Sequence, residues 1–168
     1  MFLQEVDLLS RLRHPNIVKM VDTFATYDEV VIVTKYGGID LHHLLHKPTV
    51  MLEEPYPGWI ALLWQLLRGL SYMHQKDVVH ADMKPSNCVV DDHAVLRIID
   101  VGLSWVDRPG VRPTVEDDFD TKLGGIGLMT PCYRSPEVYL CDPDFGKPMD
   151  MWGRWMHRPG VVYFKALD

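Results

Sequence analysis

Four polar side chains in the middle of the chain are spaced for phosphate and metal chemistry. Asp82, Lys84 and Asn87 lie within the stretch VVHADMKPSNCVV, and Asp100 follows in IIDVG. Asn87 and Asp100 offer oxygen ligands of the kind that Mg²⁺ takes from proteins, usually one or two, while phosphate and water complete its shell. Asp82 can accept a hydroxyl proton, and Lys84 can neutralise charge on a phosphoryl group in transfer. Each residue alone is an ordinary loop side chain, so the combination carries the prediction.

Two short strands and one long helix must position these groups. Residues 88–90 and 95–99 are β-branched runs, and the turn Asp91-Asp92-His93 joins them. Residues 59–74 predict the main core helix, largely buried, because apolar residues recur at helical spacing. The predicted buried stripe consists of Ile60, Leu63, Leu67, Leu70 and Met73.

The first third of the chain predicts a helix followed by a hairpin. FLQEVDLLSRLRH has apolar residues three and four apart, which indicates an amphipathic helix that Pro15 closes. IVKMVDTFA and VVIVT read as two strands joined by residues 26–29, and Gly37-Gly38 breaks the pattern. By contrast, residues 103–131 combine Gly, Pro and acidic residues without periodicity, which predicts a long functional or disordered loop.

Composition excludes several classes of partner. The chain has 168 residues with 17 basic and 23 acidic side chains, a net charge of -6, so it carries no footprint for nucleic acid or anionic lipid. No apolar run approaches the roughly 18 residues of a membrane span. The three cysteines form no CxxC pair, and no signal-peptide pattern opens the sequence. We therefore expect a single domain in the cytoplasm or nucleus.

In its motifs the sequence resembles the eukaryotic protein kinase family. HADMKPSN is similar to the catalytic loop H-R-D-x-K-x-x-N, and DVG to the metal-binding D-F-G. The family's substrate-docking segment, which contains A-P-E, is similar to TPCYRSPEVYL. The helix that anchors the large lobe starts with a stretch that resembles DMW. The helix with the ion-pair glutamate resembles EVDLLSRLRHPNIVKMVDTF. The YRSPE run is closest to the group of MAP kinases and cyclin-dependent kinases.

The resemblance implies roles for particular residues. Lys84, two positions after the catalytic aspartate, is typical of kinases that phosphorylate serine and threonine, with ATP and Mg²⁺ as ligands and a protein as acceptor. A regulatory protein partner is left open. The implied catalytic residues are Asp82, Lys84 and Thr130; the nucleotide-binding residues are Glu5, the gatekeeper Thr34, the hinge Lys35, Tyr36 and Gly37, and Val89 beneath the purine; the metal ligands are Asn87 and Asp100.

The sequence also departs from the family pattern. No G-x-G-x-x-G loop or strand lysine precedes the helix of Glu5, and the continuation after MDMWG does not resemble the family. Ala81 replaces an arginine that binds a loop phosphate in many kinases, and Val101 replaces the phenylalanine of D-F-G. We therefore expect an incomplete α+β kinase domain over residues 1–168: a small-lobe remnant (1–34), a hinge (35–38) and a truncated, mainly helical large lobe (39–168). The alternative is a pseudokinase or scaffold that keeps the fold without turnover.

Overall fold

The computed structural model describes residues 2–27, 29–45, 57–108, 119–120, 125–126, 129–140, 142 and 144–155. Within this part of the chain, helices and short antiparallel strands are mixed, which confirms the predicted α+β class. The helices are α1 (Phe2–Arg11), α2 (Leu41–Leu45), α3 (Pro57–Gln75), α4 (Pro136–Tyr139) and α5 (Lys147–Trp155), with 3₁₀ turns at Pro85–Asn87 and Pro131–Tyr133. The strands are β1 (Met20–Ala25), β2 (Val30–Thr34), β3 (Ile39–Asp40), β4 (Val78–Val79), β5 (Cys88–Val90), β6 (Leu96–Ile98), β7 (Trp105–Val106), β8 (Phe119–Asp120) and β9 (Gly125–Ile126).

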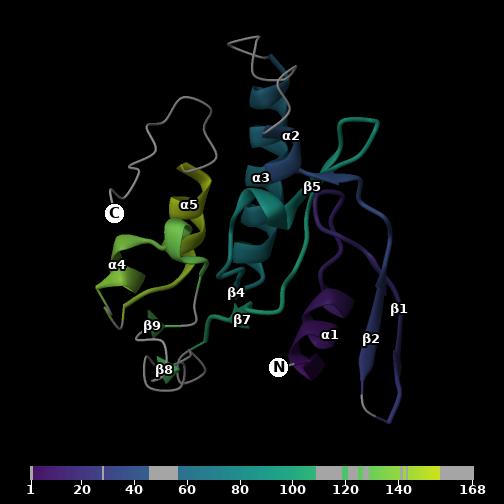
Figure 1. The fold of residues 1–168 in the computed structure, drawn as a ribbon, viewed down its shortest axis with the longest axis horizontal. Coiled ribbons are helices and arrows are strands. Elements are labelled where there is room, and N and C mark those ends of the chain that lie inside the picture. The colour runs from purple at the N-terminus through teal and green to yellow at the C-terminus, as the bar shows by residue number, and fades with distance from the viewer. Residues whose placement is uncertain are drawn as a thin grey trace.

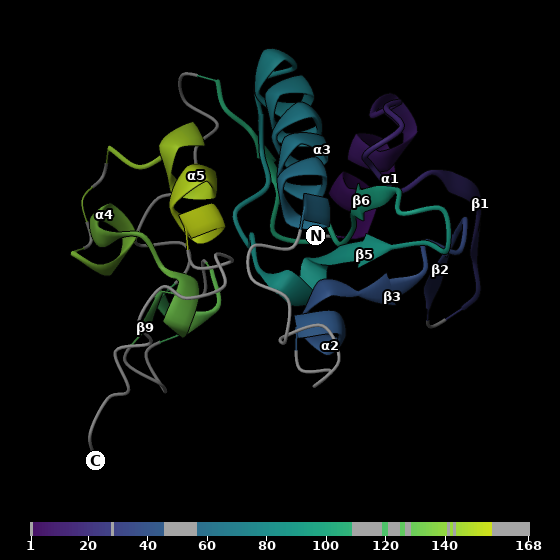
Figure 2. The same cartoon turned by 90° about the horizontal axis from the view of Figure 1, so that it is seen from above.

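The long helix α3 stands between two groups of elements (Figure 1). On one side lie α1 and the β1–β2 hairpin, and on the other lie α4 and α5. The view from above shows the same order, with β3, β5 and β6 beside α3 (Figure 2). The elements that carry the candidate site therefore meet around α3.

All strand pairs within the four described sheets are antiparallel. β1 pairs with β2, β3 and β6 flank β5, β4 pairs with β7, and β8 pairs with β9. The predicted hairpin at residues 26–29 is present, because Thr26 N–H donates to the Glu29 carbonyl at 2.7 Å and Glu29 N–H donates to Thr26 Oγ1 at 3.0 Å. The predicted strands at 88–90 and 95–99 are also confirmed, the second over Leu96–Ile98.

The core forms around one face of α3, but the predicted stripe was partly wrong. Leu66, Leu70 and Met73 are buried, whereas Ile60 is 74% exposed. The buried face also includes Gly69, where an added Cβ would lie 2.8 Å from Ile98 Cδ1. Because α3 is apolar around much of its circumference, periodicity alone does not identify the side that packs on β6.

One element boundary and one segment also differ from the sequence predictions. The helix α1 ends at Arg11, ahead of Pro15. The segment 103–131 is not wholly irregular, since β7 pairs with β4 and buries Trp105 against Phe145, with ring centroids 5.8 Å apart. Most of the remaining loop prediction lies outside the described residues. None of the helices in the described part of the chain is long and apolar enough to cross a membrane.

Candidate active site

Asp82 is the centre of a network of hydrogen bonds that joins two distant segments. Its Oδ1 accepts the backbone N–H and the hydroxyl of Thr130, both at 2.9 Å. Its Oδ2 accepts Lys84 Nζ at 2.6 Å and Asn87 Nδ2 at 3.1 Å. Lys84 Nζ also donates to Thr130 Oγ1 at 2.8 Å. The structure thus brings together the three residues that the resemblance named as catalytic.

This network keeps Asp82 ionised. Burial of the side chain raises its pKa, but the hydrogen bonds from Lys84 and Thr130 and the positive charge of Lys84 outweigh burial and place the pKa below its ordinary value. Asp82 is therefore a weak base in this state. It is better suited to orienting a hydroxyl group than to removing its proton early in a reaction.

A second carboxylate, Asp150 on α5, binds the backbone just before Asp82. Asp150 is fully buried, and its two oxygens accept the N–H groups of His80 at 2.8 Å and Ala81 at 2.9 Å. His74 Nε2 lies 2.8 Å from Asp150 Oδ2. Ala81 has φ 67°, a left-handed conformation that is unfavourable for an alanine. The bond from its N–H to Asp150 helps to hold this strained position.

Asn87 and Asp100 are placed by the ends of β5 and β6. Asn87 closes the 3₁₀ turn before β5, and its Nδ2 donates to the Asp82 carbonyl at 2.8 Å, so the carboxamide oxygen is the atom that would bind a cation. Asp100 follows β6 with φ 61°, a conformation that aspartate tolerates. The backbone links the two positions, because Ile99 N–H donates to the Asn87 carbonyl at 2.9 Å. This donor set fits Mg²⁺, which takes one or two protein oxygens alongside phosphate and water.

A cavity of about 460 Å³ lies between the β1–β2 hairpin, α1 and β5. Its volume falls within the range of small-molecule sites, which is roughly 300–1,000 Å³. Both α1 and β2 contribute one polar and one apolar residue to its lining. The residues that line it are Glu5, Leu9, Val18, Ile32, Thr34, Lys35, Tyr36, Gly37, Gly38, Val89, Ile99 and Asp100. All the nucleotide-binding residues predicted from the sequence are therefore at this cavity, although the side chain of Tyr36 is 80% exposed.

The chain approaches Val89 so closely that two positions require glycine. A Cβ at Gly37 would lie 2.4 Å from Val89 Cγ2. Gly38 has φ 106°, and a Cβ there would lie 2.0 Å from the Val90 carbonyl oxygen. The two glycines thus let the segment after β2 run directly over β5. Val89 itself is buried and forms a β-branched floor, as an adenine slot requires.

Glu5 and Asp100 bring two negative charges to one end of this cavity. A Cβ built on Gly102 would lie 3.2 Å from Asp100 Oδ1 and 3.7 Å from Glu5 Oε2, so both carboxylates border the same backbone position. Burial, and then the charge of Asp100, raise the pKa of Glu5 above its ordinary value. Among the described residues no lysine or arginine forms an ion pair with Glu5. This end of the cavity therefore attracts a cation.

The sequence did not reveal the parts played by Asp150 and His74. The DMW motif indicated only that a helix begins there, and no role followed for the carboxylate. The available signal for Asp150 was its position next to Met149, which is buried on α5. A carboxylate that is fully buried requires hydrogen-bond donors. His74 carried no such signal, since it stands near the end of α3 with a side chain that is partly exposed.

Comparison with known proteins identifies the family. The protein kinase domain matches residues 1–157. Mitogen-activated protein kinase mpkC of Emericella nidulans is 36% identical over 151 residues, covering 89% of this chain and 32% of the relative. Mitogen-activated protein kinase 5 of Oryza sativa subsp. indica is 34% identical over 171 residues (99% and 41%), and mitogen-activated protein kinase HOG1 of Exserohilum turcicum is 35% identical over 166 residues (98% and 44%). The chain thus spans less than half the length of these relatives. The motifs around Asp82 and the match over residues 1–157 establish that this chain belongs to the protein kinase domain family.

Proposed function

We propose that the chain carries the phosphotransfer site of a protein serine/threonine kinase of the MAP kinase group, acting in the cytoplasm or nucleus. The observation that carries the proposal is the Asp82 carboxylate, bound by Lys84, Thr130 and Asn87 beside a cavity of nucleotide size. MgATP is the phosphoryl donor for this reaction. The match to kinases supports the enzyme over the scaffold, and no comparison favours a protein without turnover.

The proposed roles combine the family resemblance with the geometry of the site. The adenine ring lies on Val89 and takes hydrogen bonds from the backbone of the hinge at residues 35–38, between a small-lobe segment (1–34) and a large-lobe segment (39–168). Asn87 and Asp100 hold Mg²⁺ through their oxygens. Asp82 orients the acceptor hydroxyl and receives its proton as the new P–O bond forms and the bond to ADP breaks. Lys84 neutralises charge on the group in transfer.

The backbone next to Thr130 supports a finer proposal about the acceptor sequence. Met129 has φ 62°, and its carbonyl oxygen accepts Arg134 Nε at 3.2 Å. Thr130 contacts Asp82, so this carbonyl borders the place where the residue after the acceptor must lie. Arg134 uses one of the two lone pairs of this carbonyl, so the carbonyl is a weaker acceptor for a second N–H, and a substrate residue with an N–H would pair less well there. Proline loses nothing, and we therefore propose serine or threonine followed by proline.

The experiment measures MgATP binding and phosphate transfer to a Ser-Pro peptide and its Ser-Ala counterpart. It uses the chain itself and a chain extended at its N-terminus by a glycine-rich loop and a lysine strand of the general kinase pattern. We expect D82N to reduce transfer by about 10²–10⁴-fold with ATP binding nearly unchanged, because under the proposal Asp82 contacts the acceptor hydroxyl and not the nucleotide. D100N should weaken both binding and transfer.

Asp92 in the exposed β5–β6 turn supplies the matched control, since D92N makes the same chemical change away from the cavity. If the extended protein binds ATP but shows no phosphate transfer that depends on Asp82, the enzyme proposal is wrong and the scaffold hypothesis is favoured. Equal rates on the Ser-Pro and Ser-Ala peptides would refute the proline preference while leaving the kinase proposal standing.

A further inference from the structure

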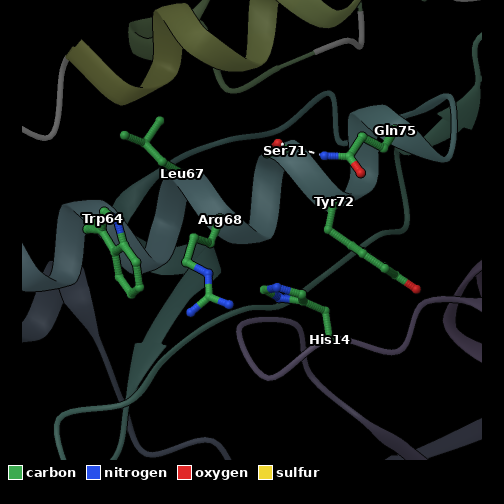
Figure 3. A pocket seen from close by; sticks show the side chains of 7 residues that line it. All are labelled: His14, Trp64, Leu67, Arg68, Ser71, Tyr72 and Gln75. Atoms are coloured by element: carbon green, nitrogen blue, oxygen red, sulfur yellow. Dashed lines mark hydrogen bonds between the residues drawn. The ribbon is translucent and has the colours of Figure 1, made fainter.

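A second cavity, of about 350 Å³, lies on the outer face of α3 and shares no lining residue with the nucleotide cavity. Six of its residues come from α3 and one from the segment between α1 and β1. The lining residues are His14, Trp64, Leu67, Arg68, Ser71, Tyr72 and Gln75. Figure 3 shows Arg68 and His14 approaching each other below α3, with Trp64 on one side and Tyr72 on the other.

Arg68 is a cation that stacks on an aromatic side chain. Its guanidinium carbon lies 4.6 Å from the centre of the Trp64 ring, a cation–π contact that restricts the side chain. Within the described part of the chain, no aspartate or glutamate forms an ion pair with it. Stacking on tryptophan leaves the edge of the guanidinium, with its N–H donors, open to a planar anion.

His14 presents a second donor to the same place. Its Nδ1 accepts the backbone N–H of Asn16 at 3.1 Å, so the ring proton of the neutral imidazole is on Nε2. The ring stacks on Tyr72 with centroids 5.1 Å apart, and the Tyr72 hydroxyl accepts Arg13 N–H at 3.1 Å. Burial, followed by the charge of Arg68, lowers the pKa of His14, so the imidazole is neutral at physiological pH and still donates from Nε2.

We propose that Arg68 and His14 form a binding site for one carboxylate of a partner protein's peptide segment, with an adjoining apolar side chain against Trp64 and Leu67. The guanidinium fork matches a carboxylate in two parallel hydrogen bonds, and His14 Nε2–H adds a third donor. A single carboxylate fits better than a phosphate dianion or an acidic run, because the whole chain carries a net charge of -6 and repels higher negative charge. The exposed Trp64 ring offers apolar surface beside the charge.

The test uses the 168-residue chain and two blocked tripeptides, acetyl-Leu-Glu-Leu-amide and acetyl-Leu-Gln-Leu-amide. NMR follows the imidazole signals of His14 during peptide and pH titrations. The groups that act on this ring are Arg68 and Tyr72 from α3, and the backbone N–H of Asn16 from its own segment. We expect the glutamate peptide to shift these signals and raise the pKa of His14, since a bound carboxylate offsets the Arg68 charge. The glutamine peptide should do neither.

Two variants and a control make the result specific. R68Q should weaken binding of the glutamate peptide by at least about 10-fold, the usual effect of losing a charged hydrogen-bond partner. H14F keeps the stacking on Tyr72 but removes Nε2–H, so we expect a smaller loss, of several-fold, which is read from the backbone amide signals of α3 because this variant has no imidazole at position 14. R11Q makes the same charge change on α1, where Arg11 pairs with Asp7, and should bind like the parent.

Three outcomes would overturn the proposal. The first is equal binding of the two tripeptides, and the second is unchanged affinity in R68Q. The third is tighter binding of inorganic phosphate than of the glutamate peptide, which would assign a different ligand to the site. None of these measurements depends on kinase activity, so they stand or fall apart from the proposed function.

Discussion

The catalytic loop and the nucleotide cavity hold their carboxylates in opposite ways. In the loop, Lys84 and Thr130 bind Asp82 and lower its pKa. At the cavity, Glu5 and Asp100 stand near each other, and the pKa of Glu5 is raised. The loop thus carries its own counter-charge, whereas the cavity has an excess of negative charge. The loop around Asp82 therefore needs no ligand to balance its charge, whereas under the proposed function a bound cation would balance the charge of the cavity.

The largest effect is expected where the loop is anchored. D150A removes the acceptor for the buried N–H groups of His80 and Ala81 and leaves both unsatisfied. Each orphaned group costs about 1–3 kcal/mol, so we expect the free energy of unfolding to fall by roughly 3–5 kcal/mol in urea denaturation. D150N keeps one carbonyl oxygen as acceptor and should lose about half as much.

D92A is the control for this prediction, because Asp92 is exposed in the β5–β6 turn and its loss should change stability by less than about 0.5 kcal/mol. A urea midpoint for D150A equal to that of D92A would contradict the anchoring role. In that case contacts other than those of Asp150 would hold the backbone of His80 and Ala81.

A smaller effect is expected for the hydroxyl of Thr130. T130V keeps the backbone bond to Asp82 but removes the side-chain bond and one acceptor of Lys84, at a cost of about 1–2 kcal/mol. The pKa of Asp82 should move up toward its ordinary value, which ¹³C NMR of the carboxyl group measures. T130S restores the hydroxyl and should return the pKa to that of the parent. An unchanged pKa in T130V would show that Lys84 and the backbone N–H of Thr130 are sufficient to keep Asp82 ionised.

The pH dependence of stability depends on the same hydrogen bonds of Asp82. The folded-state pKa of Asp82 is lowered, so the unfolded chain binds the proton more readily there. The contribution of Asp82 is complete above its unfolded pKa, near 4, and is lost as the pH falls through the folded value. T130V should therefore show a shallower loss of stability with acid than the parent. Equal slopes for the two proteins below about pH 4 would contradict this coupling.

The sequence predicted the residues of the loop around Asp82 more completely than the residue of α5 that binds its backbone. HADMKPSN has a local pattern, and the turn that places Lys84 and Asn87 follows from Pro85 and the start of β5, so the site could be predicted from a few adjacent residues. Thr130 followed only from the family resemblance. Asp150 could not be assigned, because its contacts with His80 span 70 residues of sequence and depend on how α5 packs.

The fold follows the same division between local and long-range information. The β1–β2 hairpin and the β5–β6 pair were predictable from alternating β-branched runs and polar turns. The buried face of α3 was not, since Ile60 and Leu66 are equally apolar and only contact with β6 decides between them. The strand pair β4–β7 joins residues that are distant in sequence, and its short runs carry no periodicity.

The smallest effect is expected at Glu5, and its sign is opposite to that at Asp82. Glu5 lies in the first turn of α1, where the helix dipole favours a negative charge, yet its pKa is raised, so burial and Asp100 outweigh the dipole. A raised folded-state pKa means that stability is lost as the pH rises through the range between the unfolded and folded values. E5Q should therefore raise the free energy of unfolding at pH 7 by about 0.5 kcal/mol, a magnitude typical of partly exposed charges, and should flatten this slope.

Urea unfolding between pH 4 and pH 7 checks both the stability and the slope, with E29Q on the exposed hairpin as the matched control. Lower stability of E5Q at pH 7 would mean that the helix dipole dominates, and the cavity would then have no excess of negative charge for a cation to relieve.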